Sequence, residues 1–186
     1  NPQVEGPINS PIGLTWATIF CGVSCILPDD IPFNEGLTRM IELEAPVGTI
    51  VNPRHPAPVN ARSVTLQRIF DTVRGALSKA VPERVGAQAS GSVCSISFGG
   101  VNPRNGENFV FYEAYCGALG ATRAADGADG VSCGVSNPAN IPAEAVEMDY
   151  PIRVHRFELI RDSGGAGEFR GGLGLRREYE MLADKA

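Results

Sequence analysis

The residues best placed to do chemistry lie in loops dense in glycine. Segment 162–174 reads Asp-Ser-Gly-Gly-Ala-Gly-Glu-Phe-Arg-Gly-Gly-Leu-Gly and holds six glycines in thirteen residues. Ordering six glycines costs several kcal/mol, at roughly 0.5–1 kcal/mol each relative to alanine. Such a loop needs either tight packing or a ligand, and Asp162 and Arg170 carry opposite charges that could pair across it. A packed connection between strands and a loop of an active site or subunit contact are both open alternatives.

Side chains that ligate metals or attack substrates are sparse. The two histidines, His55 and His155, are 100 residues apart. Cys21 and Cys25 lie one helical turn apart in an apolar segment, where buried and inert thiols are typical. Segment 126–130 lacks the ligand order of a calcium-binding loop. The sequence has no phosphate-binding, dinucleotide-binding or nucleophile-elbow motif. We therefore predict no metal-binding and no cofactor-binding residues in this chain.

Composition excludes several classes of protein. The 186 residues carry a net charge of −5, which argues against nucleic-acid and membrane-surface binding. The apolar segment 12–27 is too short and too polar to span a bilayer. Five cysteines without a C-x-x-C pair indicate reduced thiols and a cytoplasmic protein. Because the chain opens at Asn1 without a methionine, we expect a fragment or a processed piece of a longer protein.

Two helices are predicted in the first half of the chain. Over 12–27 large apolar residues recur every three or four positions, and the small residues between them indicate a helix buried on most sides. A second helix is predicted over 60–81, with Asn60 as its N-cap and one apolar stripe facing the core. Between the two helices, segment 37–44 half-alternates and predicts a short strand.

Strands dominate the second half. Segments 92–98 and 109–116 alternate and are joined by a polar turn, which predicts a hairpin. The glycine- and alanine-rich loop 117–130 follows, and segments 153–161 and 173–181 predict two further strands. This order favours an α+β fold, with two apolar helices in the first half packed on a mainly antiparallel sheet formed by the second half. We expect residues 1–186 to form one domain.

Several motifs occur together and in a fixed order: Gly-Pro-Ile-Asn-Ser at 6–10, Pro-Phe-Asn-Glu-Gly at 32–36, Pro-Val-Gly-Thr-Ile-Val-Asn-Pro at 46–53, Asp-Gly at 126–127, Asn-Ile-Pro-Ala-Glu at 140–144 and the glycine-rich segment 162–174. In this combination the chain resembles the hydantoinase B/oxoprolinase family over nearly its whole length. That family comprises the B-type subunit of N-methylhydantoinases and the C-terminal half of 5-oxoprolinase, and occurs in acetone and acetophenone carboxylases.

The resemblance implies a middle-to-late fragment of the catalytic B-type subunit of an ATP-dependent cyclic amidohydrolase, which opens a hydantoin or a 5-oxoproline-like lactam ring. It implies two protein partners, the remainder of the B-type subunit and an A-type subunit that binds ATP with Mg. It also implies a divalent metal in the missing upstream part, and neither nucleic acid nor membrane as a partner. The fragment alone is expected to be inactive.

Six residues are candidates for the substrate pocket that the resemblance implies: Asn9, Asn34, Glu113, Asp126, Glu144 and Arg170. Opening a lactam develops charge on the carbonyl oxygen, and the two asparagines and the arginine could donate hydrogen bonds to it. The three carboxylates could orient these donors or transfer protons. Each candidate has an ordinary alternative, such as a turn former for Asn34 and Asp126 or a helix-start charge for Glu144.

Two further functions are compatible with the same residues. A ketone carboxylase has the same family motifs, and the sequence does not separate it from an amidohydrolase. A non-catalytic assembly module is the third alternative, and it predicts an apolar surface left exposed on the isolated chain.

Overall fold

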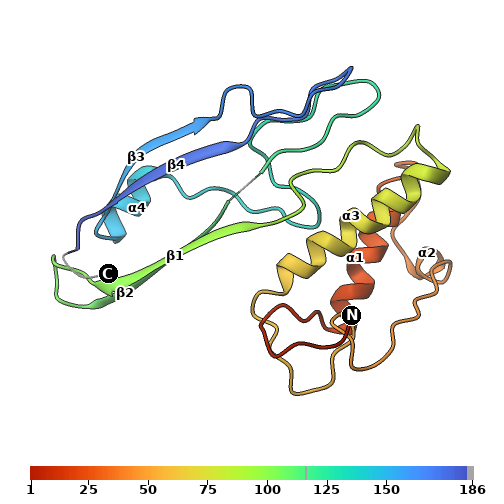
Figure 1. Cartoon of the computed structure of the whole chain (residues 1–186), viewed down its shortest axis with the longest axis horizontal. Coiled ribbons are helices and arrows are strands. Elements are labelled where there is room, and N and C mark those ends of the chain that lie inside the picture. The colour runs from red at the N-terminus through yellow and green to blue at the C-terminus, as the bar shows by residue number, and fades with distance from the viewer. Residues whose placement is uncertain (116, 184–186) are drawn as a thin grey trace. The chain divides into compact units, whose positions relative to one another are not determined.

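The computed structural model describes residues 1–115 and 117–183 (Figure 1). The chain divides into two compact units, Asn1–Ser92 and Val93–Ala186. The first unit contains helices and the second contains strands and one helix, so the predicted α+β class is confirmed.

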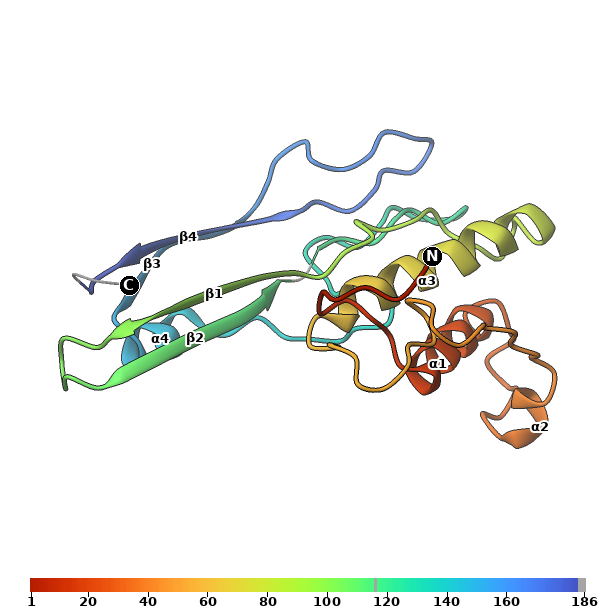
Figure 2. The same cartoon turned by 60° about the horizontal axis from the view of Figure 1, so that its bottom comes forward.

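The first unit is built on two helices that pack against each other. They are α1, Ile12–Ser24, and α3, Arg62–Ala80, and they lie side by side in Figures 1 and 2. Both predicted helices are confirmed, with ends that differ by a few residues. A Cβ built on Gly22 would lie 2.9 Å from Val73 Cγ1, so the absence of a side chain lets the two helices approach closely.

The buried face of α1 is small and polar rather than aromatic. Thr15, Thr18 and Gly22 are its buried residues, whereas Ile12 and Leu14 are exposed. The prediction of a helix buried on most sides is therefore wrong for this structure. Small residues every three or four positions form the face that meets α3, because only small side chains leave room for such a close contact.

Two local predictions in the first unit are also wrong. Segment 37–44 forms no strand; instead a single turn of helix, α2, spans Glu35–Thr38. The Asn34 side chain accepts hydrogen bonds from the backbone N–H groups of Gly36 and Leu37, which starts this turn. Asn60 is not the N-cap of α3, because the helix begins at Arg62 and its N-cap residue makes no side-chain capping bond.

Buried polar side chains connect the chain segments of the first unit. Thr15 Oγ1 donates to the Val51 carbonyl at 2.7 Å, and Thr65 Oγ1 donates to the Ile8 carbonyl at 2.5 Å. Among its described residues, Phe70 is the only large hydrophobic side chain that is buried, with 4% exposure. The first unit thus relies on hydrogen bonds between loops and helices more than on an apolar core.

The second unit contains two antiparallel hairpins and a short helix. Strand β1, Cys94–Val101, pairs with β2, Asn108–Tyr115, and β3, Ile152–Leu159, pairs with β4, Leu175–Met181. Helix α4, Ala143–Asp149, precedes β3. All four predicted strands are confirmed; Cys116, the last residue of predicted segment 109–116, lies outside the described residues. The strands form two separate two-stranded sheets.

An aromatic core holds the second unit together. Phe109 and Phe111 of β2, Val146 of α4 and Ile152 of β3 are buried, and partly buried side chains of β1, β3 and β4 pack against them. The Phe111 ring packs edge-on against Tyr150 and Tyr179, at centroid distances of 5.1 and 5.9 Å. A two-stranded hairpin is marginally stable alone, so this shared core is what stabilises both hairpins.

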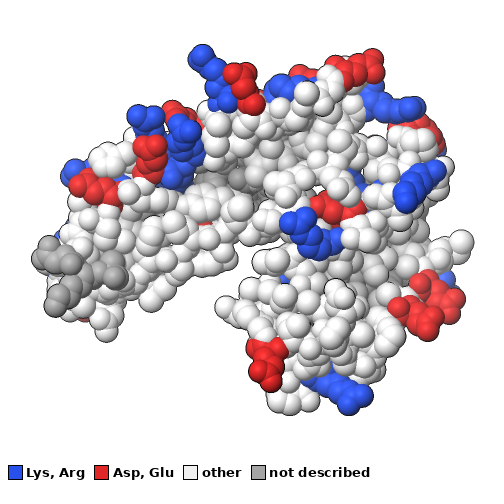
Figure 3. Space-filling view, viewed as in Figure 1, with Lys and Arg blue, Asp and Glu red and all other residues white. Residues whose placement is uncertain are grey.

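Charged side chains form no large patch of one sign on the face shown in Figure 3, where basic and acidic groups alternate. On β3, His155 lies at an irregularity in the strand pairing and its Nε2 is 2.9 Å from Glu180 Oε2.

Within residues 1–115 and 117–183, every helix falls short of the length and apolar character that a bilayer crossing requires.

Candidate functional site

Two glycine-rich loops of the second unit join through their backbones. They are segments 117–130 and 162–174, together called the glycine loop cluster here. Gly127 N–H donates to the Arg170 carbonyl at 2.7 Å, and Gly172 N–H donates to the Leu119 carbonyl at 2.9 Å. A third bond joins Gly130 N–H to the Leu173 carbonyl at 2.9 Å. These bonds connect segments more than 40 residues apart without forming a regular sheet.

The glycines of this cluster are required by close packing. A Cβ on Gly127 would lie 2.0 Å from the Leu119 carbonyl oxygen, and a Cβ on Gly172 would lie 2.1 Å from that of Ala128. No side chain fits at such distances. Of the two ways to order these loops, tight packing is therefore the one observed, and the cost of ordering glycine is offset by bonds between backbones.

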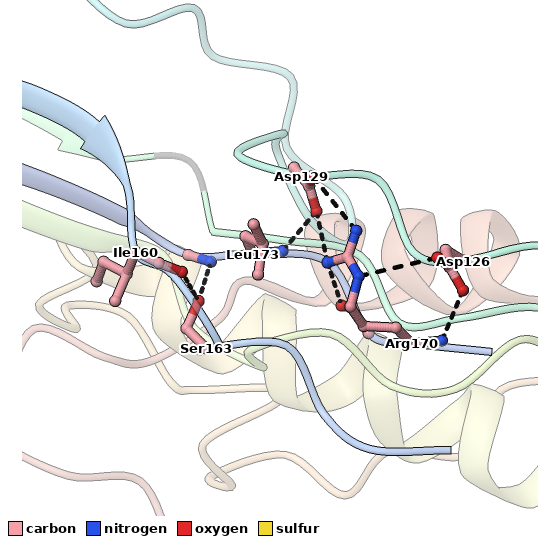
Figure 4. Close-up of polar contacts among 8 residues, drawn as sticks. Asp126, Asp129, Ile160, Ser163, Arg170 and Leu173 are labelled. Carbon is pink, nitrogen blue, oxygen red and sulfur yellow. Dashed lines mark hydrogen bonds and ion pairs between the residues drawn. The ribbon is translucent and has the colours of Figure 1, made fainter. Parts of the chain in front are cut away.

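Arg170 is the charged centre of the cluster (Figure 4). Its Nη1 donates to Asp129 Oδ1 at 2.9 Å, and its Nη2 donates to Asp129 Oδ2 at 3.4 Å. Its Nε lies 3.8 Å from Asp126 Oδ2, and its backbone N–H donates to Asp126 Oδ1 at 2.7 Å. The suggested pair of Arg170 with Asp162 is wrong, because Arg170 pairs with Asp129 and Asp126 instead. Asp162 lies in the turn that opens the loop and has a left-handed backbone, with φ of 59°.

The electrostatics of this centre follow from these bonds. The hydrogen bond from Arg170, aided by one from the Leu173 N–H at 2.7 Å, lowers the pKa of Asp129. The same bond with Asp129 raises the pKa of Arg170. The Arg170 side chain remains 41% exposed. Its Nε–H and one Nη2 hydrogen have no acceptor within hydrogen-bond distance among the described residues, although the Nε lies in an ion pair with Asp126.

A second arginine–carboxylate centre lies inside the core of the unit. Glu113 on β2 and Arg177 on β4 each have a side chain that is 1% exposed, and Arg177 Nη1 donates to Glu113 Oε1. The Ile141 N–H also donates to Glu113 Oε1, at 2.9 Å, and Arg177 Nη2 donates to the Ile141 carbonyl at 2.7 Å. The Arg177 guanidinium also stacks 4.8 Å from the Phe157 ring centroid.

Two tyrosines extend this buried centre. Tyr179 OH donates to Glu113 Oε2, and Tyr115 OH donates to Tyr179 OH at 2.6 Å. Burial raises the pKa of both tyrosines, so both hydroxyls stay protonated at neutral pH. The Glu113 carboxylate thus accepts hydrogen bonds from Arg177, Ile141 and Tyr179, and its position is fixed by these partners together.

The remaining candidate residues lie elsewhere. Asn9 is completely buried, and its side-chain amide donates to the carbonyls of Val4, Gly6 and Pro58. Asn34 caps α2, and Glu144 is exposed in the first turn of α4. Of the six candidates, only Asp126 and Arg170 are in direct contact with each other. Asn9 and Asn34 belong to the first unit and the other four to the second.

An apolar groove of about 510 Å³ opens in the first unit. Its walls are aliphatic side chains of α1, α3 and the loops before them, chiefly Ile8, Ile19, Ile50, Val64, Ile69 and Val73. The sequence pattern predicted that the apolar stripe of α3 faces a core. Part of that stripe, including Ile69 and Val73, lines this open groove instead.

The six candidates do not include Asp129 of the exposed centre or Tyr115, Arg177 and Tyr179 of the buried one. The only available signal for Asp129 was its place beside Asp126 in a glycine-rich loop. Arg177 and Tyr179 alternate along a predicted strand and so share a face, which was the available signal for them. In the described part of the chain, no group of three or more His, Cys, Asp or Glu side chains converges as a metal site.

Comparisons with known proteins agree on one family. The chain is 39% identical over 189 residues to the beta subunit of the caprolactamase of Pseudomonas jessenii, covering 97% of this chain and 32% of the relative. It is 37% identical to the B-type subunit of a putative D-/L-hydantoinase of Pseudomonas sp. strain NS671, covering 99% and 32% respectively. The chain thus spans about a third of the length of these relatives.

Solved structures show the same fold. The crystal structure of ATP-dependent caprolactamase from Pseudomonas jessenii matches with a TM-score of 0.83 and 35% identity, covering 97% of this chain and 32% of that one. A nucleotide-free acetone carboxylase structure matches with a TM-score of 0.69 and 21% identity, covering 94% and 24%, which shows the fold alone. The profile of the family described as Hydantoinase B/oxoprolinase matches residues 1–186. The chain therefore belongs to the hydantoinase B/oxoprolinase family.

Proposed function

We propose that this chain is part of the catalytic B-type subunit of a cytoplasmic, ATP-dependent cyclic amidohydrolase, which opens a lactam or hydantoin ring. The observation that carries the proposal is the likeness to caprolactamase, with 39% identity to its beta subunit over nearly the whole chain and a TM-score of 0.83. In this proposal ATP with Mg is held by an A-type subunit. A divalent metal is held by the part of the B-type subunit outside this chain.

Within this function, the glycine loop cluster forms part of the substrate pocket and Arg170 stabilises the developing oxyanion. Ring opening places negative charge on the former carbonyl oxygen, and preorganised donors stabilise it. Arg170 is oriented by Asp126 and Asp129, and its side chain is 41% exposed. Because the carboxylates hold the guanidinium before substrate arrives, it need not reorganise as charge develops.

The other candidates have less direct parts in this proposal. Asp126 is 53% exposed and is positioned to orient Arg170 or to exchange a proton with solvent. Asn34 and Glu144 are exposed and so remain accessible to a substrate or to another part of the enzyme. The bonds of Asn9 and Glu113 leave them positioning roles: Asn9 for the N-terminal segment, and Glu113 for β2 against β4.

A reconstituted enzyme tests the proposal. The chain is extended to the full family length, co-expressed with an A-type partner, and supplied with ATP, Mg and a divalent metal. ATP-dependent opening of caprolactam, a hydantoin and 5-oxoproline is then followed by the amino acid or carbamoyl product. Turnover of any of these substrates supports the amidohydrolase. No turnover by an assembled, metal-loaded complex contradicts it.

The same enzyme tests the part assigned to Arg170. Loss of one oxyanion donor lowers kcat by about 10²–10³, so Arg170→Ala should do so if the assignment holds. The matched control is Arg176→Ala, since Arg176 is an exposed arginine on β4 paired with Glu158 at 3.3 Å. Equal kcat values for the two variants, or unchanged turnover in both Asn34→Ala and Asp126→Ala, would remove the pocket assignment.

A ketone carboxylase is the second candidate function. The fold likeness to acetone carboxylase favours it, although at 21% identity that likeness concerns the fold alone. Acetone consumed with bicarbonate and ATP by the complex, in the absence of lactam opening, would establish this alternative.

A further inference from the structure

The apolar groove of the first unit has room for side chains that the unit itself does not supply. Its volume is about 510 Å³, and seven of the residues that line it are isoleucine or valine. Arg68 is the one charged residue among the described residues of its wall. The hydroxyls of the two threonines in the wall, Thr65 and Thr72, donate to the carbonyls of Ile8 and Arg68. The wall therefore suits aliphatic or aromatic side chains better than a polar ligand.

The groove leaves apolar surface of α3 open to solvent. Val64, in the first turn of this helix, is 38% exposed, and Ile69 and Val73 also line the groove. Burial of such side chains is the main favourable contribution to folding. A continuous apolar surface that stays open is therefore typical of a place that another part of a protein covers.

The first residues of the chain lie at the edge of this groove. Pro2 and Thr49 form an antiparallel bridge. Beside that bridge, the Ile50 N–H donates to the Asn1 carbonyl at 3.1 Å, and both of these residues line the groove. The N-terminus lies beside α1 and α3 in both views (Figures 1 and 2). A segment joined to Asn1 from upstream thus starts at the groove wall.

The length of the relatives favours an occupant from the same polypeptide. This chain covers 32% of the caprolactamase beta subunit and 32% of the putative hydantoinase B-type subunit, so most of such a subunit lies outside it. A covalently joined segment docks at an effective concentration on the order of millimolar, without the cost of bringing two molecules together. A separate protein must instead bury about 1,200–2,000 Å² in total to form a stable complex. One groove therefore suits a joined segment better than a separate subunit.

We propose that this groove receives apolar side chains of the segment that precedes Asn1 in the full B-type subunit. The inference rests on the proposed function only in taking this chain as part of that longer subunit. Leucine, isoleucine or phenylalanine side chains of the segment cover Val64, Ile69 and Val73. The segment thereby completes the apolar core of the first unit, to which Phe70 alone contributes a buried large hydrophobic side chain among the described residues.

Photo-crosslinking in the full-length subunit, assembled with its A-type partner, tests the proposal. The crosslinker p-benzoylphenylalanine replaces Val64 in one variant and Ala76 in a matched control, because Ala76 is an exposed residue of α3 outside the groove. After irradiation and digestion, position 64 should be joined to residues upstream of Asn1 in the same polypeptide, and position 76 should not. Crosslinks from position 64 to the A-type subunit, to a second copy or to any other segment, or no crosslink at all, would overturn the proposal.

Alkylation of a small thiol gives a second readout that does not depend on tolerance of the bulky crosslinker. Val64→Cys in the full-length subunit should react with iodoacetamide about 10- to 100-fold more slowly than Ala76→Cys, which is the equilibrium factor for burying one valine side chain. Equal rates at the two positions would contradict the proposal. Cys25 is exposed, which corrects the expectation of a buried thiol, and like the exposed Cys94 it is distinguished from the new site by peptide mass.

These two experiments separate this inference from the proposed function, because neither needs turnover. A subunit that crosslinks as expected and protects position 64, but opens no ring, supports the docking and contradicts the amidohydrolase. An active enzyme in which position 64 reacts as fast as position 76 contradicts the docking alone.

Discussion

The second unit holds two arginine–carboxylate centres that differ in their surroundings. Arg177 and Glu113 lie between the two hairpins with side chains 1% exposed. Arg170 lies in one of the two joined glycine-rich loops, and its side chain and that of Asp126 are 41% and 53% exposed. In the buried centre both carboxylate oxygens already accept hydrogen bonds from within the unit. The side chains of the exposed centre are in contact with solvent.

This difference in burial separates an ion pair that stabilises the fold, Glu113 with Arg177, from one that solvent can reach, Asp126 with Arg170. Removing one member of a buried pair leaves an uncompensated charge out of water and destabilises strongly. An exposed pair is screened by solvent and contributes little to stability. The sequence shows an arginine and carboxylates in both cases, so burial is the property that assigns the two roles. Four changes test this distinction, from the largest expected effect to the smallest.

Glu113→Ala is expected to lower the free energy of unfolding by about 3–5 kcal/mol, because it leaves Arg177 buried without its counter-charge. Urea unfolding followed by circular dichroism measures the change. The double variant Glu113→Leu/Arg177→Met is the control: it removes the uncompensated charge and should recover that part of the loss, while the Ile141 backbone and the Tyr179 hydroxyl still lose their partners. If the single variant is as stable as the wild type, the buried centre has no structural role.

Gly127→Ala is expected to destabilise the glycine loop cluster by about 1–3 kcal/mol, as overpacking does elsewhere. Its Cβ would lie 2.0 Å from a backbone carbonyl oxygen. Hydrogen exchange of segments 117–130 and 162–174 locates the loss. Gly165→Ala is the matched control, because nothing lies within 4 Å of its built Cβ. Equal effects of the two substitutions would show that backbone packing does not order the exposed centre.

Tyr115→Phe is expected to cost about 0.5–1.5 kcal/mol, the net contribution of one hydrogen bond, because it removes the bond to Tyr179. Tyr112→Phe provides the comparison on the same strand, since Tyr112 is exposed. The midpoint of urea unfolding should shift for the first variant alone. A shift of the same size for both would place Tyr115 outside the buried network.

Asp129→Asn is expected to have the smallest effect, visible as a change in pH dependence. The pKa of Asp129 is lowered below its ordinary value of 3.8, first by the bond from Arg170. The charged carboxylate therefore adds stability above pH 3.8 that is lost as the pH falls through the lower folded pKa. The stability difference between wild type and variant should shrink on acidification and in 1 M salt, where the Debye length is about 3 Å. A difference unchanged by pH and salt would contradict this account.

Local patterns predicted most of the elements, and contacts between distant residues account for what was missed. The period of α3 and the alternation of β1 to β4 are properties of short windows, and those elements were found. The sequence suggested Asp162, in the same loop, as the partner of Arg170. The observed partner Asp129 could not be predicted, because it lies 41 residues away and only the fold brings it near. Arg177 meets Glu113 across 64 residues for the same reason.

The buried face of α1 and the apolar groove were missed for a related reason. Hydrophobic periodicity predicts which side of a helix should avoid water, but the neighbour determines which side is buried. Gly22 meets Val73, so α1 turns its small residues inward. Ile69 and Val73 of α3 line a groove. Nothing in the local sequence pattern predicted that this part of the apolar stripe would be open.

The backbone bonds of the glycine loop cluster bear on how this region can diverge among relatives. Surface loops usually tolerate insertions and deletions because few contacts depend on their length. Here Gly127 and Gly172 must each face a particular carbonyl, so one added residue would displace both close contacts. We expect natural length variation to fall outside segments 126–130 and 170–174. The two loops should thus behave in evolution as a single fixed unit.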